Sequence, residues 1–182
     1  AEPNQDCIAG DKISNYWRGE LVRLRQTEPV DWETHHRWNH DEDTWRNIDY
    51  LHFPRSRVSA KTWAEEAARK TPAGDNFHME IESIEGGDLA GSIGVNNTDS
   101  RSGTFRYGVS IDSDFQQRGY ATDAIKLVLR YFFDELRYQK CTVDILASNE
   151  ASITLHERRG CVKEGQIRRA HYSEGVYHDS CY

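Results

Sequence analysis

One short stretch in the second half of the chain has the residues of an anion-binding turn, Gln116-Gln117-Arg118-Gly119-Tyr120-Ala121-Thr122. Gly119 has no Cβ and lets an anion approach the main chain, and the small Ala121 keeps the following turn uncrowded. If a helix begins here, its first N–H groups lack partners within the helix and favour phosphate binding. Arg118 would add a full positive charge. We therefore expect a pyrophosphate site, with an ordinary helix start as the alternative.

The turn is flanked by a strand and a helix that the spacing of apolar residues predicts. Residues 105–111 alternate apolar and polar side chains, which is the period of a half-buried strand. Apolar residues then recur at intervals of three and four from Ala121 to Leu136, so we expect a helix of four turns that packs on the sheet. A strand over residues 140–147 should return parallel to the first through a right-handed crossover.

Further strands are predicted on both sides of this unit. Residues 21–25 have the pattern of a first strand, and residues 77–84 and 89–95 flank a turn with two glycines, as in a hairpin. Residues 166–172 and 176–182 flank Ser-Glu-Gly and predict a terminal hairpin. The sequence therefore predicts helices together with both antiparallel and parallel strands.

Two shorter helices and one irregular arm complete the expected organisation. Thr27 and Ser59 are candidate N-caps for helices in the first half of the chain. Residues 1–19 are polar and irregular, and we expect them to form an N-terminal arm. Residues 20–182 suit a single domain with a substantial core.

A second segment, residues 149–165, carries a more specific pattern. It resembles the Asn-x-x-Ser-x-x-x-Tyr-Glu-x-x-Gly-Phe-x-x-Glu-Gly segment of the GNAT superfamily of N-acetyltransferases, in particular the RimJ/RimL type, the ribosomal-protein N-terminal acetyltransferases. His156 stands at the Tyr position of that pattern, and Cys161 stands at the Phe position. The resemblance covers residues 20–182 and includes the Gln-x-x-Gly-x-Ala turn described above.

The resemblance implies a fold and a place for a coenzyme. The expected fold is α+β (mixed α/β), the GNAT fold, with a central twisted mixed sheet of about seven strands and helices on both faces. The two parallel central strands should splay apart, and acetyl-CoA should lie in the gap. The residues that the resemblance implies for coenzyme binding are Val109, Ile111, Gln116, Gln117, Arg118, Gly119, Tyr120, Ala121, Thr122, Asn149 and Ser152. Asn149 has the alternative of being a helix cap only.

The resemblance also implies direct transfer of an acetyl group to a primary amine in a ternary complex. The amine must be neutral, the oxyanion needs a donor, and the leaving thiolate gains from a proton. His156 is the candidate acid for the thiolate, and Ser152 is its rival. Glu80 is the candidate base, on a strand face shared with Glu82. The alternatives are a solvated carboxylate at Glu80 and a reaction that needs no protein base.

Composition limits the partners. Lys and Arg number 23 against 30 Asp and Glu, a net charge of −7, which disfavours nucleic acid and fits a cationic acceptor. No apolar run approaches the roughly 20 residues that cross a bilayer, so we expect a soluble, cytoplasmic protein without membrane contact. The 4 cysteines lack Cys-x-x-Cys spacing and are expected to be reduced. A homodimer is possible.

Polar and aromatic residues gather in the first half of the chain, at His35, His36, His40, Asp41, Asp43 and Trp45. The histidines and aspartates lack the spacing of a metal site, and we expect no metal. We expect His40, Asp41, Asp43 and Trp45 to line the acceptor pocket instead.

Two questions stay open at this point. The acceptor is either a protein or peptide N-terminus or a small-molecule amine. The alternative to an enzyme is a non-catalytic acyl-CoA binding or sensing module on the same fold, which the replacement of Tyr by His156 keeps in consideration.

Overall fold

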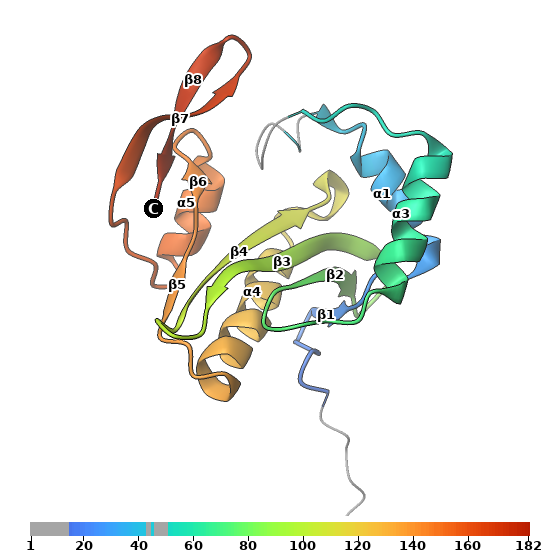
Figure 1. Ribbon diagram of the computed structural model, residues 1–182, viewed down its shortest axis with the longest axis horizontal. Coiled ribbons are helices and arrows are strands. Elements are labelled where there is room, and N and C mark those ends of the chain that lie inside the picture. The colour runs from blue at the N-terminus through green and yellow to red at the C-terminus, as the bar shows by residue number, and fades with distance from the viewer. Residues whose placement is uncertain (1–14, 43–44, 46–50) are drawn as a thin grey trace, which may run out of the picture.

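The computed structural model describes residues 15–42, 45 and 51–182, and in them the strands form two sheets (Figure 1). The larger sheet has the order β1 (Val22–Arg25), β2 (Phe77–Ser83), β3 (Leu89–Asp99), β4 (Thr104–Ile111) and β5 (Lys140–Thr142). Its pairs are antiparallel except β4 with β5, which is parallel. The smaller sheet has the order β6 (Ile145–Leu146), β8 (Val176–Cys181) and β7 (Gln166–Ser173). The predicted mixed α/β architecture is confirmed.

The division into two sheets differs from the single sheet of about seven strands that we expected. The predicted strand over residues 140–147 is interrupted, and its first part pairs with β4 only from Thr104 to Arg106. At the interruption, the Asp144 carboxylate accepts hydrogen bonds from the hydroxyls of Ser180 and Tyr182. These bonds hold the chain against β8, so β6 continues in the other sheet and diverges from β4.

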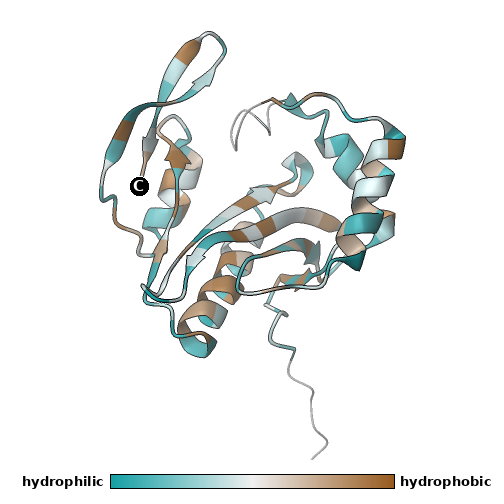
Figure 2. Cartoon of the chain, viewed as in Figure 1, coloured by the Kyte–Doolittle hydropathy of each residue, from teal (hydrophilic) through white to brown (hydrophobic). Residues whose placement is uncertain are grey.

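One long helix covers a face of the larger sheet and forms the core with it. α4 (Tyr120–Arg130) has Ala124, Ile125 and Val128 fully buried, and the apolar segments of α4 and the strands are visible in Figure 2. The predicted helix of four turns changes form after Arg130, because η3 (Tyr131–Glu135) is a π-helix. Its widened turn is closed by a hydrogen bond of 3.2 Å from Leu136 N to Tyr131 O.

The opposite face of the sheet meets the helices of the first half of the chain, η1 (Pro29–Asp31), α1 (Trp32–Trp38) and α3 (Arg57–Arg69). Neighbouring residues of β2 point to opposite faces, and Ile81 belongs to the core that α4 covers. Glu80 therefore points the other way, where His35 of α1 lies 2.9 Å from it. The prediction of helices on both faces is confirmed.

The two predicted N-caps are wrong by a few residues. The Thr27 hydroxyl donates to Glu80 across the sheet face, and the helical segment begins after Glu28, whose N–H donates to the Asp31 carboxylate. The second helix is capped by Ser56, which accepts from Ser59 N at 3.1 Å. Ser56 takes the cap of the second helix because its hydroxyl accepts from a free N–H group of the first turn.

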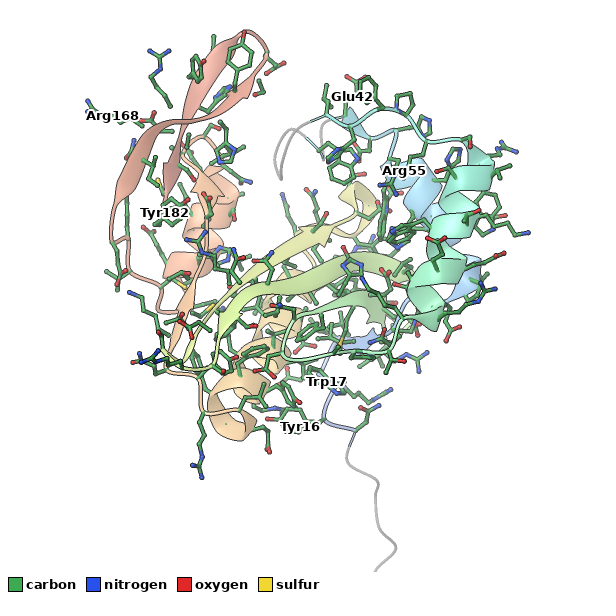
Figure 3. All side chains as sticks on the ribbon, in the orientation of Figure 1. Tyr16, Trp17, Glu42, Arg55, Arg168 and Tyr182 are labelled. Atoms are coloured by element: carbon green, nitrogen blue, oxygen red, sulfur yellow. The ribbon has the colours of Figure 1, made fainter. Side chains whose placement is uncertain are left out.

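The described part of the expected N-terminal arm, residues 15–19, packs on the domain. The Trp17 ring lies 4.7 Å from that of Tyr131 and 6.0 Å from that of Phe77, and Figure 3 shows Tyr16 and Trp17 beside the sheet and α4. The Asp123 carboxylate of α4 accepts hydrogen bonds from the N–H groups of Leu21 and Val22. Residues 1–14 lie outside the described part.

Two further elements belong to the described part of the chain, η2 (Ser113–Phe115) after β4 and α5 (Glu150–Glu157) after β6. The predicted terminal hairpin is confirmed as β7 and β8, and it projects from the body in Figure 1. No described helix is long and apolar enough to cross a membrane.

Candidate active site

A cavity of about 990 Å³ lies where β4 and β5 separate, between β4, the turn before α4, β6 and α5. It brings together most of the predicted site residues from two distant parts of the chain. Those that line it are Val109, Ile111, Gln116, Gln117, Gly119, Tyr120, Ala121, Thr122, Asn149, Ser152 and His156. Arg118 and Glu80 are predicted site residues outside the lining.

The cavity exposes an unpaired edge of β4. β5 pairs with this strand only up to Arg106, so the outer edge beyond it has no strand partner in the described residues. Asp112 N donates to Ala90 O of β3, and the side-chain amide of Gln116 donates to Ile111 O on the other side. Because main-chain groups of successive strand residues point to opposite edges, those of Val109 and Ile111 face the cavity.

The turn after β4 has the geometry of an anion site. Gly119 is the N-cap of α4 with φ 84°, and Gln117 has φ 60°, so both residues lie in the left-handed region. A Cβ at Gly119 would lie 3.1 Å from Leu21 Cδ1. The α4 N-terminus that this turn exposes offers free N–H groups to the cavity.

Arg118 is directed away from this turn. Its guanidinium donates to Asp114 O at 2.8 Å and lies 5.2 Å above the Phe115 ring. These contacts connect Arg118 to the segment before the turn, and its role in coenzyme binding stays a prediction.

The N-terminal end of α5 forms the opposite wall. Asn149 Oδ1 accepts from Ser152 N at 3.0 Å, so Asn149 caps the helix and lines the cavity as well. Asn149 is therefore a helix cap, and its contact with the coenzyme stays a prediction that its place in the cavity lining permits. Gly160, with φ 88°, follows the helix in the left-handed conformation typical of a helix end.

His156 is held in this wall by its own helix and by a strand. Its Nδ1 lies 2.7 Å from Ser152 O, and its ring stacks on that of Tyr107 at 5.8 Å and 24°. His156 is 5% exposed, and neither its Nε2 nor the Tyr107 hydroxyl has a hydrogen-bond partner among the described residues. Burial raises the pKa of Tyr107 well above its usual range, so its hydroxyl stays protonated.

Tyr107 is a residue that the sequence analysis did not select. The alternating pattern of β4 assigned it to the buried face, and it is in fact 7% exposed and part of the core. Its position in the cavity wall depends on where β5 leaves the sheet. The one signal in the sequence was a hydroxyl-bearing aromatic residue within a predicted core strand.

Glu80 has a different environment from the one that we expected for a base. Its side chain is 0% exposed and accepts from the Thr27 hydroxyl at 2.6 Å, with His35 at 2.9 Å and His78 at 3.5 Å. Burial alone would raise the pKa of Glu80, but hydrogen bonds from His35, His78 and Thr27 lower it to about 2. The structure places this carboxylate in a buried network that connects β2 to α1.

Of the expected acceptor-pocket residues, Asp41 lines the cavity. His40 Nδ1 lies 2.8 Å from His36 O, and Trp45 Nε1 donates to Trp38 O at 3.0 Å. Asp43 lies outside the described residues.

Within residues 15–42, 45 and 51–182, no group of three or more His, Cys, Asp or Glu side chains could hold a metal ion. Cys141, Cys161 and Cys181 are free thiols. Burial raises the pKa of Cys141 to about 12, so its thiol is neutral near pH 7.

The acetyltransferase (GNAT) domain family matches residues 22–162. The chain belongs to this family. The SPbeta prophage-derived uncharacterized N-acetyltransferase YokL of Bacillus subtilis (strain 168) is 37% identical over 165 residues, which are 90% of this chain and 89% of that protein. The present GNAT protein is therefore an acetyl-CoA-dependent acyltransferase, and nothing in the comparisons supports a non-catalytic sensing module.

Solved structures share the fold of this GNAT protein at low identity. Spermidine N-acetyltransferase from Vibrio cholerae, in complex with CoA and spermine, has a TM-score of 0.74 at 19% identity, covering 88% of this chain and 92% of that chain. RimL, a ribosomal α-N-protein acetyltransferase in complex with coenzyme A, has a TM-score of 0.75 at 17% identity, covering 88% and 91%.

Proposed function

We propose that this GNAT acetyltransferase transfers the acetyl group of acetyl-CoA directly to a primary amine while both are bound. The observation that carries the proposal is the cavity between β4 and α5, in which an unpaired strand edge leads to an open helix N-terminus. The pantetheine amides would pair with Val109 and Ile111 as an added strand does. The pyrophosphate would bind the N–H groups from Gln117 to Ala121.

The same geometry supplies the groups that the chemistry needs. The amine nitrogen attacks the thioester carbonyl carbon, and the Val109 N–H, which faces the cavity, would donate to the oxyanion. Asn149 and Ser152 would contact the coenzyme near its sulfur. His156 and Ser152 lie in the wall where the thiolate would leave, and both are candidates to hydrogen-bond it.

We further propose that the acceptor is cationic. The lining contains the carboxylates of Asp41, Asp144 and Glu150 and no lysine or arginine of the described residues. The Asp144 carboxylate accepts from two neutral hydroxyls, so no cation cancels its charge in these bonds. A polyamine or a positively charged N-terminal segment has this chemistry, and the latter would be the acceptor of a RimJ/RimL-type enzyme.

The proposal is tested by measuring release of free thiol from acetyl-CoA across a panel of polyamines, amino acids and peptides with free N-termini. We expect turnover with cationic members, with mass spectrometry showing the acetylated amine. His156→Phe should lower kcat while calorimetry shows unchanged coenzyme affinity. Tight coenzyme binding without turnover on any amine would contradict the proposed function.

A further inference from the structure

The hydrogen bond at Nδ1 fixes the proton of the neutral His156 ring. A carbonyl oxygen only accepts, and Nδ1 lies 2.7 Å from Ser152 O. Nδ1 must therefore carry the hydrogen, and a neutral imidazole has only one. Nε2 of the neutral ring is consequently a lone-pair acceptor. In this tautomer His156 can donate from Nε2 to the leaving sulfur only after Nε2 has gained a proton, because the single hydrogen of the neutral ring is used within α5.

The acceptor nitrogen is buried but has no protein partner. His156 is 5% exposed, it lines the cavity, and its Nε2 is unpaired among the described residues. An unsatisfied buried polar atom costs about 1–3 kcal/mol, so such atoms need an explanation. The Nδ1 bond occupies the other ring nitrogen, so Nε2 is the one polar atom of this cavity-lining ring that lacks a partner among the described residues.

We propose that His156 relays the reaction's proton, with Nε2 accepting it from the attacking amine and then delivering it to the leaving sulfur. This inference rests on the proposed function and assigns a role within it. One residue then serves as base and acid in sequence. Glu80 is not needed as the base.

The steps balance with the two substrates alone. The amine lone pair forms the C–N bond at the thioester carbon, and the nitrogen loses a proton to Nε2, which makes the ring an imidazolium. The oxyanion collapses, the C–S bond breaks, and sulfur leaves with its electron pair. The sulfur takes the proton from Nε2, and the products are the amide, the free thiol and a neutral His156.

In a pH study, the titration of His156 must be distinguished from that of other groups around the ring and in the cavity. They are Tyr107 on β4, Cys161, whose N–H donates to His156 O, Cys141, which interacts with Tyr107, and the cavity-lining Asp144 and Glu150. Burial raises the pKa of Cys141, Cys161 and Tyr107, so these groups remain neutral near pH 7.

The first measurement is the tautomer of His156 in the free protein, read from nitrogen chemical shifts of ¹⁵N-histidine-labelled protein with His156→Gln for assignment. We expect the hydrogen on Nδ1 in the neutral form. A hydrogen on Nε2 would overturn the proposal. This readout does not depend on turnover, so it is distinct from a failure of the proposed function.

The second measurement is the pH profile of kcat/KM with two acceptors whose amine pKa values differ. One acid limb of the profile should have the same midpoint pH with both acceptors, and it should disappear in His156→Gln. The amide of that variant can hydrogen-bond to Ser152 O but cannot carry the proton. We expect kcat to fall about 100-fold or more in that variant, as for loss of a general base. His178→Gln, in the distant hairpin, is the control and should match the parent.

A third variant separates a relay from simple hydrogen-bond donation. The hydroxyl of His156→Tyr can donate to sulfur but cannot readily take a proton from the amine near pH 7. A relay predicts that this variant is as slow as His156→Gln. The proposal would be overturned if His156→Tyr kept most of the parent rate. It would also be overturned if the midpoint of the acid limb changed only with the pKa of the acceptor amine.

Discussion

The Tyr107 side chain connects strand β4 to the candidate catalytic histidine through its ring. Its hydroxyl has no partner among the described residues, whereas its ring stacks on His156. Tyr107→Phe should therefore leave the free energy of unfolding unchanged or slightly higher and kcat within about twofold. Tyr107→Leu removes a ring contact of about 0.5–1.5 kcal/mol, and we expect kcat to fall about 2–10-fold.

Urea unfolding and steady-state rates measured on both variants check this prediction. Coenzyme affinity serves as the internal control and should not change with Phe. An equal loss of kcat in Tyr107→Phe and Tyr107→Leu would show instead that the hydroxyl participates directly.

Glu80 should make stability depend on pH in the acid range. Its pKa in the folded state is about 2 against an ordinary value of 4.5, because hydrogen bonds from His35, His78 and Thr27 outweigh burial. The lowered pKa contributes stability that is fully present above about pH 4.5 and is lost as the pH falls toward 2. Glu80→Gln should lower the free energy of unfolding by on the order of 3 kcal/mol at pH 7, as when one partner of a buried pair is removed.

Urea unfolding at pH 7, 5 and 3 measures this difference. The difference in the free energy of unfolding between the parent and Glu80→Gln should narrow as the pH falls. Glu85→Gln, in the exposed β2–β3 turn, should have the free energy of unfolding of the parent at each pH. A gap that is constant with pH would contradict the assigned pKa.

The same residues show which parts of the site were predictable. Gln117, Gly119 and Asn149 act through local main-chain geometry, so their residue types and spacing were informative. Glu80 was predicted as a base from its strand position alone, and its buried network was not foreseen because its partners Thr27 and His35 lie 53 and 45 residues away in sequence. No local pattern records such pairings.

At the scale of elements, the turn before α4 depends on one left-handed residue. Gly119→Ala would place a Cβ 3.1 Å from Leu21 Cδ1 at φ 84°, beside the expected pyrophosphate. Gly175→Ala is a matched control, because its φ is 81° and a Cβ there meets no atom within 4 Å. The backbone cost of each is on the order of 1 kcal/mol.

We expect both variants to lower the melting temperature, whereas only Gly119→Ala should weaken coenzyme binding, by about tenfold or 1.4 kcal/mol. Calorimetric titration with CoA measures the difference. Equal coenzyme affinity in the two variants would argue against anion binding at this turn.

Element boundaries separate into those set locally and those set by distant contacts. β4 was predicted because alternation is a local property, as was the start of α4 after Gly119. The break between β5 and β6 was not predicted, because the Asp144 carboxylate is held by Ser180 and Tyr182. That contact opens the cavity, so the decisive feature of the site arises from the far end of the chain.

At the scale of the whole molecule, α1 connects strand β2 with the end of strand β4. Arg37 and Trp38 donate to the Asp112 carboxylate, each at 2.6 Å, at the point where β4 enters the coenzyme turn. His35, on the same helix, binds Glu80 of β2. One short helix thus connects the segment expected to bind the acceptor with the turn expected to bind the pyrophosphate.

The charge of the molecule should act on the acceptor at long range. The chain carries a net charge of −7, and Asp41 lines a cavity that also contains Asp144 and Glu150. Because the Debye length falls to about 10 Å at 0.1 M salt, attraction of a cationic amine weakens as salt is added. With acetyl-CoA saturating, kcat/KM for a polyamine should fall between about 0.01 and 0.3 M salt, and that for an uncharged amine should not.

Asp41→Asn should raise KM for the polyamine about 3–10-fold, a change of about 1 kcal/mol, whereas Asp88→Asn in the exposed β2–β3 turn should not. A salt response shared by charged and uncharged acceptors would instead locate the effect in the protein or the coenzyme, and the acceptor would then be recognised by shape rather than by charge.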